Sequence, residues 1–461
     1  MQTQLAIKVG VIFGIALLIL IPISMVKSKV YERQLYLEQA KAAVTRSWTG
    51  PQLVMTPVIV IPYTQHAVPM KSGFYTDAKG LSEKRNKFLM PARSEIEGVV
   101  ENRNLHKGIY DIPVYVSRLN LSASFNGERL KNELSRLKET SGVDEVQTPY
   151  ILLHISDVRG IDSEPLLSVN GEQLTLESGS RLLNLPGGLH SELRSFHTVD
   201  KPLELSISLV LRGLESLAFV PLGDYAALSI QSNWPHPEFV GASLPRERSI
   251  SAEGFNAQWL TTKYANRTQG VFASCAIDGQ CDSLLGSSSG VRFIEPVDIY
   301  LQSERSIKYA MLFIGLSFIS FFVFENIKRV QIHPIQYTFV GLAIAIFYLL
   351  LISLAEHLAF ATAYTIAVAC CVGLLLFYVR YVFNSLASSL LFSTLTAGLY
   401  GLLYVIIQAE DFALLLGSVL VFTVLAAVMF ITRDMDWYEL GGSRKSGGNA
   451  SASINSGTDD E

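Results

Sequence analysis

The stretch that decides the fold is residues 337–355, YTFVGLAIAIFYLLLISLA, which contains no charged side chain. A helix of this length is about 28 Å long at 1.5 Å per residue, close to the hydrocarbon thickness of a bilayer. Working outward, similar apolar runs occupy the rest of the C-terminal part: Tyr309–Phe324, Leu358–Val379, Leu386–Gln408 and Phe412–Thr432. These runs predict a C-terminal bundle of about five transmembrane helices, the first of which begins a turn earlier, near Ser306.

A further apolar run, Leu5–Val26, lies near the N-terminus and contains one charged residue, Lys8. Two interpretations compete for it, an uncleaved transmembrane anchor and a cleaved signal peptide. A signal peptide has a short apolar core and small residues at its cleavage site, whereas Pro22, Met25 and Lys27 stand at the end of this run. We therefore expect an uncleaved anchor.

Composition agrees with a membrane protein, because 49% of the 461 residues are hydrophobic and only 17% are charged. The formal net charge of -4 and the absence of a long Lys/Arg block argue against nucleic acid as a partner. Four segments are predicted: an anchor at 1–29, a folded domain at 30–306, a helix bundle at 307–432, and a flexible Gly/Ser-rich tail at 433–461.

The folded domain is predicted to be largely antiparallel β structure. A helix at Tyr31–Trp48 continues the anchor outward, and the short apolar strand Pro57–Tyr63 follows the break at Gly50-Pro51. Apolar residues then alternate with polar ones in several segments, and one helix is expected at Glu128–Thr140. The alternating segments are 109–125, Tyr150–Val158, Leu203–Leu211 and Tyr225–Gln231.

The short connections between the C-terminal apolar runs predict the orientation. Every second connection carries basic residues and is expected in the cytoplasm, whereas the connections near Glu356 and Glu410 carry none and are expected outside. Both termini are then cytoplasmic, and the large domain is external. The basic residues after the anchor oppose this rule, but long translocated domains are largely exempt from it. The basic residues that place their connections in the cytoplasm are Lys328, Arg329, Arg380, Arg433, Arg444 and Lys445. Those that oppose the rule are Lys27, Lys29 and Arg33.

Four cysteines are present. Cys275 and Cys281 lie in the external domain with five residues between them, and an oxidising compartment favours a disulfide over two free thiols. Spacing alone leaves both states open. Cys370 and Cys371 lie within an apolar run and are expected to be small packing residues.

The sequence provides no motif for an enzyme, a metal or a cofactor. Nucleophile-elbow, phosphate-loop and dinucleotide motifs are missing, so we expect no catalytic residues and no cofactor. The external histidines lack metal-ligand spacing; His190 and His197 are close enough to converge on a metal, although polar surface residues are the simpler interpretation.

Ionisable residues near the ends of the apolar runs form one candidate site. Glu356, His357, Gln408, Glu410 and Asp411 are predicted to meet at the outer mouth of the bundle. The simpler alternative is that these residues, like Glu325, are interfacial loop residues solvated by water or headgroups.

A second candidate site is a membrane-proximal collar. The chain enters the external domain through Arg46–Tyr63 and leaves it through 290–300, so both segments lie close to the membrane. We expect Trp48 and Phe293 to supply apolar contact and Arg46 to pair with an acidic residue, Glu295 or Asp298. Two flexible linkers are the alternative, although linkers rarely contain so many large apolar residues.

Several strings resemble the CreD family of bacterial inner-membrane proteins. Arg46-Ser47-Trp48 with Gly50-Pro51-Gln52 is similar to the start of that family's external domain. The segment from Gly290 to Tyr300, GVRFIEPVDIY, is similar to the segment through which that family's chain returns to the membrane. The bundle strings are HPIQY at 333–337, SLAEH at 353–357, QAEDFALLLGS at 408–418, and Asp436-Trp437. The resemblance implies an envelope-integrity protein of the inner membrane, linked to a two-component stress response and to tolerance of colicins and cell-wall antibiotics.

The resemblance implies no reaction and no catalytic residues, so three functions remain in competition. The favoured one is a structural or interaction protein whose β domain contacts envelope or cell-wall partners in the periplasm. The alternative is a transporter or enzyme acting on a lipid-linked or cell-wall substrate at the outer mouth. A sensor would need a cytoplasmic output domain, and the tail is too short to be one.

Overall fold

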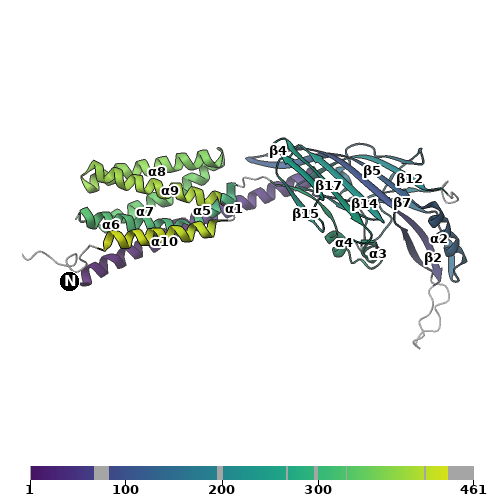
Figure 1. The fold of residues 1–461 in the computed structure, drawn as a ribbon, viewed down its shortest axis with the longest axis horizontal. Coiled ribbons are helices and arrows are strands. Elements are labelled where there is room, and N and C mark those ends of the chain that lie inside the picture. The colour runs from purple at the N-terminus through teal and green to yellow at the C-terminus, as the bar shows by residue number, and fades with distance from the viewer. Residues whose placement is uncertain are drawn as a thin grey trace, which may run out of the picture. The chain divides into compact units, whose positions relative to one another are not determined.

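The computed structural model describes residues 2–66, 82–194, 201–265, 268–294, 299–328, 330–409 and 412–433. The chain divides into two compact units, a helical unit of Met1–Tyr36 with Val297–Glu461 and a β unit of Leu37–Pro296 (Figure 1). The first helix, α1 (Gln2–Ser47), is continuous across the limit between them. The predicted helix at Tyr31–Trp48 is therefore the C-terminal part of α1.

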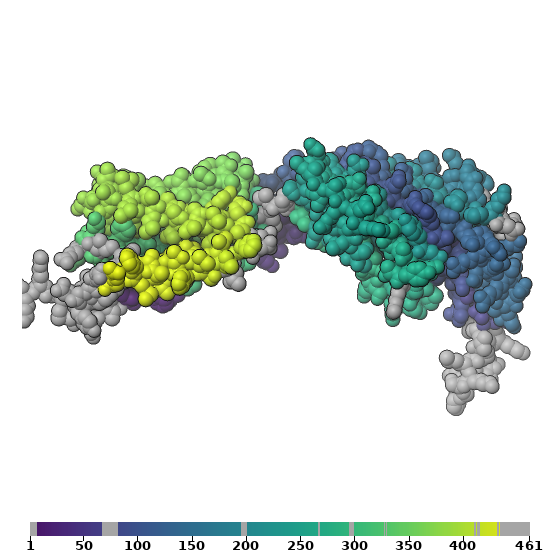
Figure 2. Space-filling model, viewed as in Figure 1, coloured from purple at the N-terminus to yellow at the C-terminus, as the bar shows by residue number. Residues whose placement is uncertain are grey.

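Among the described residues, the helical unit contains the first part of α1 and six further helices. These are α5 (Ile299–Lys308), α6 (Ala310–Lys328), α7 (Pro334–Ala355), α8 (Phe360–Phe383), α9 (Leu386–Gln408) and α10 (Ala413–Thr432), and α10 lies on the face turned to the viewer in Figure 2. Local sequence sets their ends. His333 and Gln336 form a capping box before Pro334, and Asn384 ends α8 in the left-handed region, at φ 47°.

Four helices among the described residues are long and apolar enough to cross a bilayer: Ile7–Ser47, Pro334–Ala355, Phe360–Phe383 and Leu386–Gln408. A fifth span arises if Ile299–Lys308 and Ala310–Asn326, bent by 46°, are taken together, and Leu415–Phe430 is a shorter apolar helix. The predicted class is confirmed: a membrane protein with an N-terminal apolar helix, a β domain and C-terminal apolar helices.

The β unit contains three sheets among the described residues. The largest has the strand order β16-β17-β14-β4-β5-β12-β8-β9, the second β10-β11-β7-β2-β3 with β6 beside β2, and the smallest β1-β13-β18-β15 (Figure 1). The strands are β1 (Gln52–Met55), β2 (Val58–His66), β3 (Ser82–Leu89), β4 (Arg93–Lys107), β5 (Tyr110–Phe125), β6 (Val143–Val146), β7 (Tyr150–Leu153), β8 (Leu166–Val169), β9 (Glu172–Leu174), β10 (Glu177–Ser178), β11 (Leu189–Glu192), β12 (Leu203–Leu214), β13 (Ser216–Val220), β14 (Tyr225–Ser232), β15 (Pro237–Gly241), β16 (Glu247–Ser251), β17 (Gly254–Thr262) and β18 (Ser289–Phe293).

Alternating side chains explain the large sheet. In β12 the leucines and Ile207 are buried while the serines between them are exposed, so one face packs on the core and the other is polar. The predicted helix is α2 (Gly127–Glu139), with the Asn126 side chain as its N-cap. Two pairings, β1 with β13 and β14 with β4, are parallel, and they join segments that are far apart in sequence.

Candidate functional site

The candidate site in the helical unit is a stripe along one side of α1. Ile15, Ile19, Ile23, Val26 and Val30 are buried, and their spacing of three or four residues places them on one helix face. Lys8, seven residues or about two helical turns before Ile15, and Arg33, three residues after Val30, lie near the two ends of this face. Both form ion pairs with residues of the helical unit.

Lys8 pairs with Glu325, which lies in the last turn of α6. The Glu325 side chain is buried. Its carboxylate accepts two further hydrogen bonds, from the Ile332 N–H to Oε1 at 3.0 Å and from the Tyr337 hydroxyl to Oε2 at 2.8 Å. A buried carboxylate is stable only when paired and hydrogen-bonded, and these three donors supply that environment. Glu325 is thus a buried anchor rather than a solvated loop residue.

At the other end of the stripe, Arg33 Nε lies 3.0 Å from Glu356 Oε1. Glu356 caps the C-terminus of α7, and its side chain is only 10% exposed. The two pairs are 25 residues apart on α1, which is about 37 Å along a helix and slightly more than the hydrocarbon thickness of about 30 Å. This separation fits one pair near each membrane interface.

Close packing joins α1 to the bundle between the two pairs. Gly341 of α7 lies directly against Ile19, and a Cβ atom at this glycine would overlap Ile19 Cδ1 and lie 2.9 Å from Phe318 Cζ. A glycine is needed where two helices approach this closely.

The structure describes three of the five residues that were predicted to meet at the outer mouth. Glu356 pairs with Arg33, the His357 N–H donates to Leu354 O at 3.0 Å, and Gln408 is the last residue of α9. Glu410 and Asp411 lie outside the described residues. The meeting of all five at one site stays a prediction.

Hydrogen bonds link two tyrosines and a cysteine inside the bundle. The Tyr364 hydroxyl donates to Tyr400 O at 2.7 Å, and the Tyr400 hydroxyl lies 3.2 Å from Cys371 Sγ. Tyr348 and Tyr400 are fully buried, and Tyr348 takes part in the same packing through Phe347. These tyrosines pack the interior of the bundle.

The structure describes three of the five predicted collar residues, and each of the three contacts other residues of the β unit. The guanidinium groups of Arg103 and Arg212 lie over the Trp48 ring, 5.0 and 4.8 Å from its centroid. Phe293 belongs to the main core, 5.2 Å from the Tyr115 ring, and Arg46 accepts a hydrogen bond from Arg159 through its carbonyl. Glu295 and Asp298 lie outside the described residues.

The segment that enters the β unit and the segment that leaves it are both hydrogen-bonded to the same short stretch, Leu214 and Glu215. The Leu214 N–H donates to Gly50 O at 3.2 Å, and the Phe293 N–H donates to the carbonyl of the next residue, Glu215, at 2.8 Å. Strands β1 and β18 accordingly flank β13 on its two sides. This shared neighbour links the start of the β unit to its end.

A polar network fixes the start of the β unit. The buried Gln52 amide donates to Thr49 Oγ1 at 2.9 Å and to Arg212 O at 3.0 Å, while Thr49 donates to Asp157 at 3.0 Å. Hydrogen bonds from Arg159 to the Asp157 carboxylate, 2.6 and 2.9 Å long, are the main reason that the pKa of Asp157 is lowered to about 2.

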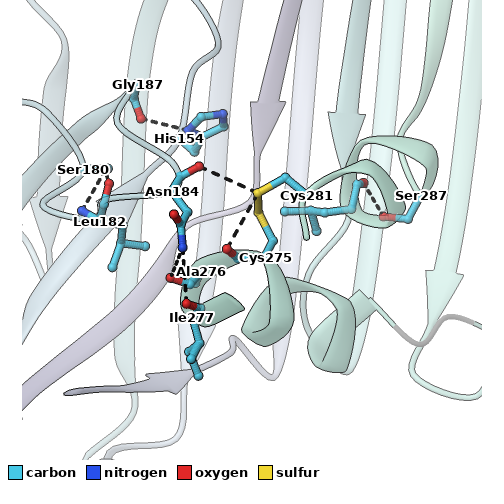
Figure 3. The surroundings of a disulfide bond; sticks show 11 residues. His154, Ser180, Leu182, Asn184, Gly187, Cys275, Ala276, Ile277, Cys281 and Ser287 are labelled. Carbon is cyan, nitrogen blue, oxygen red and sulfur yellow. Dashed lines mark hydrogen bonds between the residues drawn. A yellow bond between two sulfur atoms is a disulfide. The ribbon is translucent and has the colours of Figure 1, made fainter. Parts of the chain in front are cut away.

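Cys275 and Cys281 form a disulfide that links helix α3 (Thr268–Asp278) to the start of α4 (Asp282–Gly286). Figure 3 shows the Asn184 side-chain amide donating to the carbonyls of Ala276 and Ile277, at 3.2 and 3.3 Å. These contacts hold the disulfide loop against a distant segment of the β unit.

Two of the external histidines, His154 and His190, contact backbone carbonyls. His154 Nδ1 lies 2.8 Å from Gly187 O, and burial lowers the pKa of this imidazole. His190 Nδ1 lies 2.7 Å from Gly179 O, and His197 lies outside the described residues. In the part of the chain that the structure describes, no three His, Cys, Asp or Glu side chains come together as a metal site.

Comparison with known proteins identifies the family. The family model described as inner membrane protein CreD matches residues 4–438. The inner membrane protein CreD of Escherichia coli (strain K12) is 35% identical over 447 residues, covering 95% of each chain. The chain belongs to the CreD family.

In this CreD-family chain, sequence reasoning missed the partners of Glu325 and Glu356. The signal that could have identified them is the spacing in α1, where Lys8 and Arg33 stand at the ends of the buried stripe. Charged residues that flank an apolar helix face are candidates for ion pairs at the two membrane interfaces. The arrangement is suited to holding α1 in the bundle.

Proposed function

We propose that this inner membrane protein maintains the cell envelope without catalysing a reaction, and that its β unit contacts envelope partners in the periplasm. Its role then connects to envelope stress and to tolerance of colicins and cell-wall antibiotics. The domain limits 1–29, 30–306, 307–432 and 433–461 are part of this proposal. Family membership supports it, since the matched relative is named an inner membrane protein.

The observation that carries the proposal is the insertion of a large β unit between two membrane segments. Both of its ends meet at β13, and its eight-stranded sheet has a broad polar face. Such a face is a surface for binding another envelope component, in line with an interaction protein. The collar of Arg46, Trp48, Phe293, Glu295 and Asp298 is retained as the part that would fix this unit above the membrane.

The orientation in the proposal follows from the ends of the helices. Lys8 lies near the start of α1, and Lys328 and Arg380 lie near the ends of α6 and α8. If successive spans cross the membrane in opposite directions, these three residues are on one side of it. Glu356 and Gln408, at the ends of α7 and α9, are then on the other side. The positive-inside rule assigns the first group to the cytoplasm.

Reporter fusions test this orientation. Alkaline phosphatase, which is active only outside the cytoplasm, should be active when fused at Gly127 or Ala409 and inactive when fused at Lys328. Activity only at Lys328 would reverse the orientation and refute a periplasmic role for the β unit.

The Arg33–Glu356 pair favours the alternative, a transporter or enzyme that uses a polar site at the outer mouth, because such sites keep ionisable side chains near the membrane. We test it by neutralising Glu356, His357, Glu410 and Asp411 together in cells that lack the chromosomal copy. An interaction protein should still restore colicin and antibiotic tolerance after this change. A transporter or enzyme should lose all activity while remaining at normal levels in the membrane.

A further inference from the structure

A groove of about 350 Å³ lies on the outer face of the large sheet, away from the residues discussed so far. It follows β14 and is bordered by β4 on one side and by β17 and β16 on the other. Its lining is Glu95, Ile96, Glu97, Tyr225, Ala227, Leu228, Ser229, Arg246, Glu247, Gln258, Trp259 and Leu260.

The register of the strands explains why a sheet face is hollowed here. Ala227 pairs with Glu95 on one side and with Leu260 on the other, and Ser229 pairs in the same way with Glu97 and Gln258. Short side chains on the central strand therefore lie between longer ones on both neighbours. Neighbouring strands are about 4.8 Å apart, so the walls stand about 10 Å apart, which is the width of a single ring with its substituents.

The lining has donors, acceptors and an aromatic ring in one place. Glu97 and Glu247 offer carboxylates that form no ion pair among the described residues, Gln258 offers an amide, and Arg246 offers a guanidinium group. At one end Tyr225 supplies a ring, and the Arg93 guanidinium lies over it, 4.8 Å from the ring centroid. The Arg93 guanidinium also pairs with Glu95 at 2.7 Å, so the two side chains lie together along this wall.

Hydroxyl groups continue from the groove across the rest of the face. Glu95 is in register with Ser122 of β5, Ser122 with Ser206 of β12, and Ser206 with Ser168 of β8. A chain of sugar units lying across the strands would meet a serine on each of β5, β12 and β8.

We propose that this groove and the serine row beside it bind a glycan chain. A sugar ring combines hydroxyl groups, which pair with carboxylates, amides and guanidinium groups, with an apolar face that packs on an aromatic ring. A strongly cationic peptide fits less well, because Arg246 lies in the groove and Glu95 is already paired with Arg93. The proposal rests on the periplasmic position of the β unit, where cell-wall glycan is present.

Binding is tested with the purified full-length protein in detergent and a soluble N-acetylglucosamine oligomer as the probe. Wild type should bind the oligomer saturably in a calorimetric titration. Ser229→Leu fills the floor of the groove and should weaken binding at least about tenfold, and Glu97→Gln should weaken it in the same direction. The matched control is Ser208→Leu, which makes the same change on the same face at an exposed position of β12 outside the groove, and it should bind as wild type does.

The inference is overturned if wild type does not bind the oligomer, if Ser229→Leu and Ser208→Leu bind equally well, or if a lysine-rich peptide binds in the groove in place of the glycan. Reporter fusions at Gly127 are read separately from this titration. A failed titration with an external β unit refutes the glycan site alone, whereas a cytoplasmic β unit refutes the proposed function.

Discussion

Replacing Glu325 by alanine should destabilise the helical unit strongly. The change leaves Lys8 without its counter-ion, and it leaves the Ile332 N–H and the Tyr337 hydroxyl without their acceptor. Each unsatisfied donor costs about 1–3 kcal/mol, and breaking a buried ion pair costs about 3–5 kcal/mol in all. We therefore expect the free energy of unfolding to fall by about 3–5 kcal/mol.

A double-mutant cycle isolates the pair itself. Lys8→Met leaves the buried Glu325 without its opposite charge, and Glu325→Gln leaves the partly exposed Lys8 without its own, whereas the double variant removes both charges. We expect the double variant to be more stable than the sum of the single changes predicts, by about 1–3 kcal/mol. Exchanging the two residues should lower the free energy of unfolding more than neutralising both does, because an ammonium group at position 325 would face the N–H of Ile332.

The assay is unfolding in mixed detergent and SDS micelles, followed by the loss of helical circular dichroism. Lys29→Met is the control on the same helix, since Lys29 pairs with Glu32 at an exposed position and its loss should change little. If Glu325→Ala unfolds at the same SDS fraction as Lys29→Met, or if the two single effects add, then the buried anchor is not formed in the membrane protein.

Three further changes test other parts of the structure. Gly341→Leu should lower stability by about 1–3 kcal/mol or more in the same assay because α1 is forced away from α7, while Gly373→Leu, at a position with open space, should not. The lowered pKa of Asp157 means that its contribution to the stability of the β unit is present above about pH 4 and is lost as the pH falls toward 2, so Asp157→Asn should remove part of the acid sensitivity between these values, measured by tryptophan fluorescence. Alkylation without reductant should label neither Cys275 nor Cys281; the closed loop is short, so replacing both by serine should lower stability by only about 2–3 kcal/mol.

Local patterns in the sequence were sufficient for the elements and the class of the protein. Span length and the lack of charge predicted the apolar helices, and alternation predicted the strands around Leu203 and Tyr225. These signals are local because a bilayer requires a helix of fixed length, and a half-buried strand repeats every two residues. The helices α3 and α4 beside the disulfide were not predicted, since their short segment has no clear periodicity.

Tertiary structure alone decided which distant residues became partners. Lys8 and Glu325 are 317 positions apart, and nothing local distinguishes Glu325 from a solvated residue at the end of a helix. The parallel pairing of β14 with β4 likewise created the groove, by placing short side chains of one strand between longer ones of two others. Sequence fixes which face of a helix or strand is apolar, because that depends on residues a few positions apart. Which other element covers that face depends on the packing of the whole chain, and so the ion pairs and the groove became visible only in the folded protein.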